Sequence, residues 1–473
     1  MVTPIPDNQA SFTLEDVARA TGGRLRAGRA DGVRGVVTDS RAVREGCLFV
    51  ALRGEHHDAH RFVPDAVRQG AAAVLVARGT TVPEGPAVVE VEDTLWALGD
   101  LAALHRRRWK GRVVGITGSA GKTSTKELTA AALRACGFAV HPTQGNLNNL
   151  VGLPMTVLQL DEGVDAAVLE MGTNRPGEIA RLADVGRPDV GVITLVSAAH
   201  TEGLGNVEKV AEEKAALLMA LEPRGTAVVQ GDDATLVSWA ERSPAEHVLF
   251  FGQGAGAQVR LVRWELEPEL RTRCTFALAG RDEPLVARLR LLGEAAAINA
   301  AAALAAVVAI GADPVRAATA LEEVAPSPGR MHPLAGERDT LVLDDSYNAN
   351  PRSTALALDT AAELGRLRDG RVVAVLGDMK ELGDRSIDEH RAVGEHAARV
   401  GVAVLVAIGD AMAHAAQAAA ARGIRTVRVA RAEDAIEPVR DVLLEGDVVL
   451  VKGSRSLATE RVAHALHAGE GTS

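Results

Sequence analysis

A glycine-rich loop between an apolar strand and a helix constrains this chain more than any other feature of its sequence. The segment TGSAGKTS, residues 117–124, follows a strand expected over 112–116 and precedes a helix expected over 122–136. In that setting backbone N–H groups and the helix N-terminus face an anion, and glycine lets the backbone approach phosphate without a Cβ clash. Lys122 can reach the β- and γ-phosphate oxygens of a nucleotide, and the Thr123 hydroxyl can bind Mg²⁺. The loop therefore predicts a nucleotide site on an α/β fold.

The loop departs from the usual G-x4-G-K-[ST] template, because the residue five before Gly121 is Ile116. It matches a shorter G-x-x-G-K-T form that begins at Gly118. The ordinary alternative is a glycine turn before a surface helix, but the apolar strand before the loop favours phosphate binding. No N-K-x-D segment typical of guanine binding is present, so ATP is favoured over GTP. The candidate ATP contacts in the loop are Thr117, Gly118, Ser119, Ala120, Gly121, Lys122, Thr123 and Ser124.

The 473 residues are long enough for several domains, and the pattern of strands and helices predicts three α/β units. Residues 1–92 form a small first unit, and residues 93–326 form a middle unit that contains the loop. The last unit, residues 327–473, begins within the Pro/Gly-rich segment PSPGR. Regular alternation predicts a doubly wound sheet in the middle unit and a Rossmann-like sheet in the last. Strands are also expected over 33–37 and 190–196, and over 247–252, 259–266, 272–278 and 285–292 as an antiparallel flap.

Composition narrows the class of protein. The formal net charge is −10 and aromatic residues make up 3% of the chain, which argues against a general nucleic-acid binder. Three widely separated cysteines offer no disulfide framework or metal spacing, and favour a reducing cytoplasm. The N-terminus lacks the apolar core of a signal peptide, and the longest apolar run, Ala300 to Ile310, is too short to span a membrane. We therefore expect a cytoplasmic monomer without membrane insertion or nucleic-acid partner.

Three further residues lie where an open α/β sheet binds its ligands, at or beyond the carboxyl ends of strands. Glu170 ends the strand of VLEMGTNRPGEI, His200 follows the next strand, and Lys214 lies on the helix expected over 207–221. Taken singly, each has an ordinary alternative: a solvated carboxylate, a structural histidine and a surface lysine. Together with the loop, these segments resemble the Mur ligase family, ATP-dependent enzymes that form amide bonds during peptidoglycan assembly.

The resemblance implies a metal set and a reaction. Thr123, Glu170, His200 and Lys214 are expected to bind Mg²⁺, with Lys214 carbamylated so that it resembles a carboxylate. Two metal ions that bridge a phosphoryl group neutralise its charge and align the attacking and leaving oxygens. A substrate carboxylate would attack the γ-phosphorus of ATP, and an amine would then attack the resulting acyl phosphate. The implied catalytic residues are Lys122, Glu170, His200, Lys214 and Arg330.

The resemblance also implies that the last unit closes over the nucleotide. Gly329-Arg330 resembles a family motif whose arginine approaches the γ-phosphate, and LDDSYNANPRS contains the only tyrosine. The candidate ATP contacts there are Arg330, Asp345, Tyr347 and Asn350. Asn299 matches the second asparagine of a family G-x-H-N-x-x-N pattern, but Ala295 and Ala296 stand where that pattern has His and Asn.

Segments at both ends of the chain resemble one branch of the family. TDSRAVREGCLFVALRGEHHDAH resembles the block that contacts longer UDP-muramoyl peptides, and TQGNLNN offers asparagines suited to a peptide backbone. DSYNANP, LGDMKELG and VKGSRSLATERV together resemble members that join D-alanyl-D-alanine to UDP-N-acetylmuramoyl-tripeptide. The candidate substrate contacts are Ser40, Arg41, Asn146, Asn148, Asn149, Lys452, Ser454 and Arg455.

Three alternatives stay open. The member that adds the preceding diamino acid would show D-Y-A-H-x-P and D-N-P-R segments, and neither occurs here. A folylpolyglutamate-type ligase shares the loop and the metal chemistry, but the Asp-Ser-Arg block argues against a folate substrate. A non-enzymatic nucleotide-dependent module would keep the loop without needing Glu170, His200 and Lys214 together.

Lysine is scarce in this chain, with only seven among 52 lysine and arginine residues. A retained lysine is therefore a candidate for a role that arginine cannot perform. Carbamylation of Lys214 is one such role. Lys126 and Lys380 also lie in motif segments, without a role that the sequence identifies.

Overall fold

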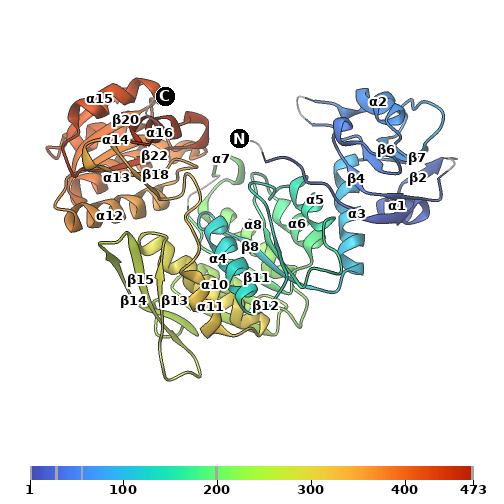
Figure 1. Ribbon diagram of the computed structural model, residues 1–473, viewed down its shortest axis with the longest axis horizontal. Helices are drawn as coiled ribbons and strands as arrows, with labels where there is room; N and C mark the ends of the chain where they lie inside the picture. The colour runs from blue at the N-terminus through green and yellow to red at the C-terminus, as the bar shows by residue number, and fades with distance from the viewer. Residues whose placement is uncertain (1–2, 27–29, 55–56, 198–200, 470–473) are drawn as a thin grey trace.

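The computed structural model describes residues 3–26, 30–54, 57–197 and 201–469 of the chain. Three α/β units, each built on its own sheet, follow one another in chain order, with the middle unit between the other two (Figure 1). This confirms the predicted three-unit α/β architecture, while the divisions after residues 92 and 326 stay predictions.

The N-terminal unit has one small parallel sheet with an antiparallel edge strand. Its strands lie in the order β2 (Arg24–Arg26), β7 (Ala87–Val91), β6 (Ala73–Ala77), β5 (Leu48–Val50) and β4 (Val36–Val37), with helices α1 (Leu14–Thr21) and α2 (Val63–Arg68). The single strand expected over 33–37 is wrong. Gly35 has a left-handed φ of 85°, and it separates β4 from β3 (Gly32–Arg34), which pairs instead with β1 (Ser11–Thr13).

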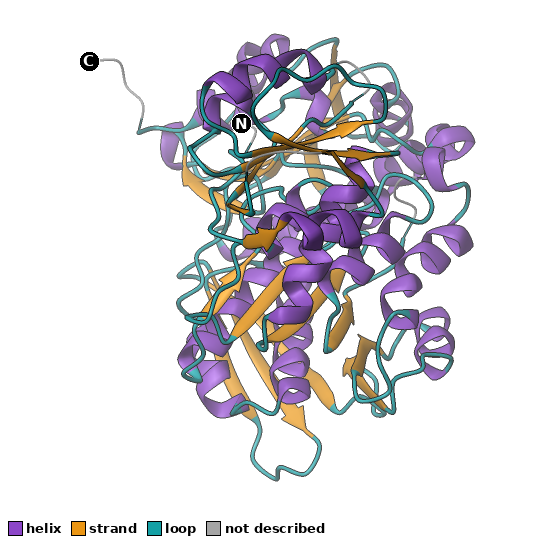
Figure 2. Ribbon diagram, turned by 90° about the vertical axis from the view of Figure 1, so that its right-hand side faces the viewer, coloured by secondary structure: helices purple, strands orange, loops and turns teal. Residues whose placement is uncertain are grey.

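The middle unit is a nine-stranded sheet covered by helices (Figure 2), and the phosphate-loop strand is third from one edge. Its strands lie in the order β16 (Leu285–Leu289), β15 (Arg271–Leu278), β14 (Val259–Glu267), β13 (His247–Gly252), β12 (Thr226–Gln230), β11 (Val190–Ile193), β8 (Arg112–Thr117), β10 (Ala166–Glu170) and β9 (Val140–Pro142). From β9 to β14 in this order, each strand runs parallel to the next, whereas β14, β15 and β16 pair antiparallel at one edge. The expected antiparallel flap is therefore confirmed for its last three strands and wrong for 247–252, because β13 pairs in parallel with both β12 and β14. Parallel order brings the carboxyl ends of β8, β10 and β11 to the same edge.

Helices cover this sheet and connect it to the other units. They are α3 (Thr94–Arg108), α4 (Lys122–Ala135), α5 (Gly152–Val157), α6 (Glu178–Gly186), α7 (Thr201–Leu204), α8 (Val207–Met219), α9 (Ala234–Glu241), α10 (Gly293–Ile310) and α11 (Pro314–Leu321). Helix α10 is apolar and long enough to cross a membrane, but 67% of it is buried, and its alanines pack against α4 as part of the core. Helix α3 contributes to an apolar cluster shared by the N-terminal and middle sheets.

The C-terminal unit is a six-stranded sheet with helices packed against it. Its strands lie in the order β17 (His332–Ala335), β18 (Leu341–Asp345), β22 (Val448–Lys452), β19 (Val372–Gly377), β20 (Val402–Ile408) and β21 (Arg425–Val429). Its helices are α12 (Pro351–Leu367), α13 (Ser386–Val400), α14 (Met412–Ala420), α15 (Ile436–Val442) and α16 (Glu460–Leu466). Leu266 of the flap and Leu292, just before α10, join the apolar cluster of this unit, so its core is continuous with the middle unit.

Candidate active site

The phosphate loop has the backbone shape that its glycines predict. Gly121 precedes α4 with a left-handed φ of 82°, and a Cβ at Gly118 would lie 1.9 Å from the Thr194 hydroxyl oxygen. That hydroxyl donates to the Ala120 carbonyl at 2.6 Å, and Ser119 N–H donates to the Leu195 carbonyl. The strand expected over 190–196 therefore ends at Ile193, because the following residues hydrogen-bond the loop instead of β12.

Lys122 is held within its own loop. Its Nζ donates to the Gly118 carbonyl at 2.7 Å. Burial lowers the pKa of Lys122, the Glu170 carboxylate opposes this shift, and the Arg330 guanidinium adds to it. Burial is the main cause of the shift, and an anion such as phosphate beside the ammonium would stabilise its charged form.

Glu170 is a buried carboxylate between two polar partners, at 2% exposure. Its Oε2 accepts from the Thr123 hydroxyl at 2.8 Å, and its Oε1 accepts from the Asn148 amide at 2.8 Å. Hydroxyl and carboxylate oxygens are ligands that Mg²⁺ prefers. In the part of the chain that the structure describes, no three His, Cys, Asp or Glu side chains form a closed metal site. Thr123 and Glu170 are the residues here that could hold a Mg²⁺ ion.

Lys214 is buried on α8, with 1% exposure. Burial lowers its pKa to about 7, the Lys122 ammonium adds to this shift, and the neighbouring Glu213 opposes it. A large fraction of this amine is therefore neutral near pH 7, as addition of CO₂ requires. The Glu213 carboxylate instead accepts hydrogen bonds from the backbone N–H groups of Gly177 and Ile179. His200 lies outside the described residues.

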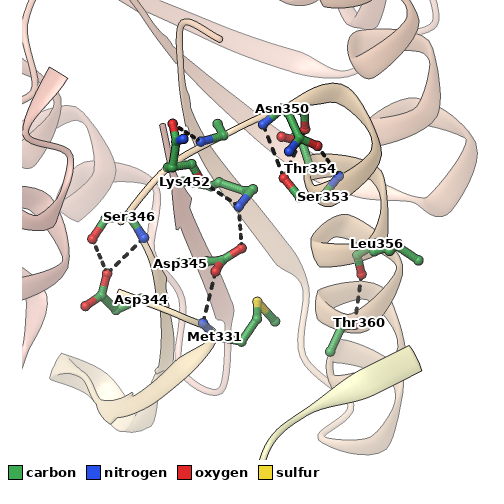
Figure 3. Close-up of polar contacts among 12 residues, drawn as sticks. Met331, Asp344, Asp345, Ser346, Asn350, Ser353, Thr354, Leu356, Thr360 and Lys452 are labelled. Atoms are coloured by element: carbon green, nitrogen blue, oxygen red, sulfur yellow. Dashed lines mark hydrogen bonds and ion pairs between the residues drawn. The ribbon is translucent and has the colours of Figure 1, made fainter. Parts of the chain in front are cut away.

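An ion pair of the C-terminal unit, Asp345 with Lys452 (Figure 3), lines the same cavity as the loop. Lys452 Nζ lies 2.6 Å from Asp345 Oδ2 and donates to the Asn348 carbonyl at 2.9 Å. Burial raises the pKa of Asp345, and Lys452 opposes this shift. Asp345 Oδ1 also accepts from the backbone N–H of Met331 at 3.1 Å, which ties the linker to the end of β18.

Asn350 connects this wall directly to the phosphate loop. Its side-chain oxygen caps α12 by accepting from Ser353 N–H at 2.9 Å, and Asn350 N–H donates to the Ser353 hydroxyl (Figure 3). Its amide nitrogen donates across the domain boundary to the Ser119 carbonyl at 3.4 Å. One asparagine thus joins the N-termini of two helices, α4 and α12, that both face the same space.

A cavity of about 680 Å³ lies between the middle and C-terminal units. The predicted site residues that line it are Ser119, Ala120, Gly121, Lys122, Thr123, Ser124, Asn146, Asn148, Asn149, Glu170, Asn299, Arg330, Asp345, Tyr347, Asn350 and Lys452. Residues from seven separate segments of the sequence are therefore brought to one site.

Other predicted residues lie apart from the cavity lining. Thr117 is buried beneath the loop, and Ser454 accepts from Lys380 N–H at 2.8 Å. Arg455 lies at the Tyr347 ring, 5.9 Å from its centre. Ser40 and Arg41 belong to the N-terminal unit, where Arg41 is 89% exposed and pairs with Asp39.

Sequence reasoning missed one wall of the cavity. Leu292, Ala295 and Ile298, in and beside the first turns of α10, line it together with Arg352 and Leu356 of α12. In the sequence, the alanines at 295 and 296 indicate only a departure from a family motif. Apolar helix residues look like core in a sequence, and only the meeting of α10 with α12 makes this wall.

Family models match along most of the chain. The Mur ligase middle domain matches residues 116–307, the Mur ligase glutamate ligase domain matches 329–455, and the Mur ligase family catalytic domain matches 32–106.

Curated relatives match over nearly their full length. UDP-N-acetylmuramoyl-tripeptide--D-alanyl-D-alanine ligase of Escherichia coli (strain K12) is 36% identical over 464 residues, covering 96% of this chain and 98% of the relative. The ligase of the same name from Bacillus subtilis (strain 168) is 33% identical, covering 91% of this chain and 92% of the relative.

Solved structures share the arrangement of the three units. A crystal structure of MurF from Acinetobacter baumannii has a TM-score of 0.87 and 29% identity, over 97% of this chain and 99% of that one. MurF ligase from Thermotoga maritima in complex with ADP has a TM-score of 0.80 and 30% identity, over 91% of this chain and 96% of that one.

Proposed function

This chain belongs to the Mur ligase family, and we propose that it joins D-alanyl-D-alanine to UDP-N-acetylmuramoyl-tripeptide with hydrolysis of ATP. The products are ADP, phosphate and the UDP-linked pentapeptide. The observation that carries the proposal is the interdomain cavity, in which the phosphate loop and Glu170 face the Asp345–Lys452 pair. The relatives named for this reaction, with 32–36% identity over more than nine-tenths of the chain, support the choice of substrates.

The phosphate loop is proposed to bind the ATP phosphates. Its backbone N–H groups lie at the N-terminus of α4, where an anion is stabilised. Lys122 and Arg330 supply positive charge at the γ-phosphate, and Asn350 holds the C-terminal unit against the loop through Ser119. A MurF ligase complex with ADP supports nucleotide binding by this fold.

Charge control is the main task during phosphoryl transfer. When bound, Mg²⁺ would neutralise phosphate charge, and Thr123 and Glu170 are the residues proposed to hold it. His200 and carbamylated Lys214 are proposed for a second ion. Lys214 supports this assignment by its burial and by a pKa near 7, which leaves the amine reactive toward CO₂.

The chemistry takes two steps. The terminal carboxylate of the tripeptide attacks the γ-phosphorus, the bond to ADP breaks, and an acyl phosphate forms. The amine of D-alanyl-D-alanine then attacks the acyl carbon, phosphate leaves, and the amine loses a proton. The acyl phosphate must be kept from water, which an interdomain cavity achieves when its walls close.

The substrates are proposed to meet at this cavity from two sides. Asn146 and Asn149 line its middle-domain wall and can bond a peptide backbone. Ser40 and Arg41 are proposed UDP contacts in the N-terminal unit. Lys452, Ser454 and Arg455 are proposed dipeptide contacts at the end of β22. A monomeric protein of the cytoplasm is part of the same proposal.

The test is detection of the product by mass spectrometry. Purified protein with ATP, Mg²⁺, UDP-tripeptide and D-alanyl-D-alanine should yield the UDP-pentapeptide, with phosphate release only when both substrates are present. Product from UDP-dipeptide and a diamino acid, or from a folate and glutamate, would instead support one of the alternative ligases. Phosphate release without dipeptide would contradict the ordered chemistry.

A further inference from the structure

Lys126 is a buried lysine to which the proposed reaction assigns no part. It lies on α4 three residues after Thr123, so both side chains share one face of the helix. The Lys126 side chain is 1% exposed. A buried ammonium is costly unless hydrogen bonds satisfy it. The partners of Lys126 therefore indicate what it does.

The ammonium bonds the backbone of a neighbouring strand end. Lys126 Nζ donates to the Thr143 carbonyl at 2.7 Å and lies 2.7 Å from Glu127 Oε1. Thr143 follows β9 directly and begins the segment that carries Asn146, Asn148 and Asn149. Lys126 thus attaches the start of the asparagine segment to the phosphate-loop helix.

Thr143 in turn bonds the end of β10. Its N–H donates to the Val168 carbonyl at 2.9 Å, and its hydroxyl accepts from the Glu170 N–H at 3.0 Å. The Glu170 carboxylate in turn accepts a hydrogen bond from the hydroxyl of Thr123, on α4, at 2.8 Å. The contacts form a closed circuit: Thr123 to Glu170, Glu170 to Thr143, Thr143 to Lys126, and Lys126 along α4 to Thr123.

We propose that Lys126 is a positioning residue that holds Glu170 against Thr123 for metal–nucleotide binding. It acts through Thr143 and touches neither substrate nor metal. The inference rests on the proposed function only in assigning Thr123 and Glu170 to the metal that accompanies ATP. It also explains why lysine is retained here: a guanidinium is a wider planar fork with five donors, whereas this buried site offers two acceptors.

The test compares Lys126→Met with Lys209→Met. Lys209 is a matched control, because it is an exposed lysine of the same unit that pairs with Glu212 on the surface. Mn²⁺ binding to the full-length protein with a non-hydrolysable ATP analogue is measured by electron paramagnetic resonance. Outer partners of metal ligands typically change metal affinity by about 10–100-fold. We expect a loss of that size in Lys126→Met and none in Lys209→Met.

A purely structural lysine would give a different result. The folded fraction of Lys126→Met would then bind Mn²⁺ as tightly as the wild type, and this outcome overturns the proposal. If Lys126→Met does not fold, Thr143→Val decides, because it keeps the carbonyl that Lys126 bonds and removes the oxygen that accepts from Glu170 N–H. Weaker Mn²⁺ binding in Thr143→Val supports the circuit, and unchanged binding overturns it.

The binding assay needs neither the tripeptide nor the dipeptide. A wild-type protein that binds Mn²⁺ and nucleotide but makes no pentapeptide would contradict the proposed function, while the comparison with Lys126→Met would still decide this inference.

Discussion

The guanidinium of Arg330 stacks on the ring of Tyr347, with its central carbon 4.1 Å from the ring centre. The two residues come from the linker and from the turn after β18, and Tyr347 N–H donates to the Gly329 carbonyl beside Arg330. Both line the cavity. The stacking therefore fixes where the arginine charge stands relative to the phosphate loop.

Replacement of the Tyr347 ring should weaken ATP binding. A cation–π contact contributes about 0.5–2 kcal/mol. Tyr347→Leu should therefore raise KM for ATP by about 2–30-fold in steady-state assays. Tyr347→Phe keeps the aromatic face and should stay near the wild type. Equal effects of the two substitutions would show that the hydroxyl, not the ring, holds Arg330.

Asn350 can be tested for its two contacts separately. Asn350→Asp keeps a good N-cap oxygen for α12, but it removes the donor to the Ser119 carbonyl and places negative charge near the phosphates. We expect KM for ATP to rise about tenfold, because the substitution adds a negative charge and removes one hydrogen bond. The melting temperature should change little.

Ser353→Ala is the matched control, since it removes only the return bond of the capping box. It should lower stability by about 0.5–1 kcal/mol and leave KM for ATP unchanged. A melting temperature that falls more in Asn350→Asp than in Ser353→Ala would contradict this division of roles.

Gly121→Ala should weaken nucleotide binding, as measured by calorimetry. The new Cβ would meet Asn299 Oδ1 at 2.3 Å, and the left-handed backbone would be strained as well. Gly137→Ala shares the left-handed strain, at φ 96°, but has no atom within 4 Å of the new Cβ. It should lose about 1–2 kcal/mol of stability and keep nucleotide affinity. Similar affinity in both variants would show that the loop tolerates a side chain there.

Lys214 should show a CO₂ dependence that follows its pKa of about 7. CO₂ adds only to the neutral amine, whose fraction rises as the pH rises through 7. At a fixed concentration of dissolved CO₂, enzyme depleted of CO₂ should therefore regain activity faster at pH 8 than at pH 6, with a mass gain of one CO₂. Lys214→Ala should be inactive and partly rescued by short carboxylates, while Lys209→Ala stays active. Failure of rescue would count against a carboxylate-like role.

Much of the fold could be predicted because its signals are local. The apolar run over 112–116 followed by the glycine loop became β8 and α4, and three of the four expected flap strands became β14, β15 and β16. Two strand predictions were wrong because contacts with distant parts of the chain ended or divided the strand. Ile193 ends β11 because the next residues bond the phosphate loop, and Gly35 turns the chain toward two different strands.

The candidate site could also be predicted in part, because several of its residues lie in local sequence motifs. Motif residues near a strand end could be named from the sequence, and most of them line one cavity. The wall made by α10 and α12 was missed, because an apolar helix face in a sequence does not say whether it meets a core or a cavity. The metal role of His200 and the UDP contacts of Ser40 and Arg41 stay predictions.

Lys126 shows which properties of this protein its sequence determines and which only the tertiary structure decides. The scarcity of lysine in this chain and the place of Lys126 after the phosphate loop are properties of the sequence. So are the strand, loop and helix around it, because each depends on neighbours a few residues apart. Its partner, Thr143, is 17 residues away on another element. That contact, and the choice of Asp345 instead of Asp344 as the partner of Lys452, arise only when strands far apart in the chain pack side by side and bury their polar groups.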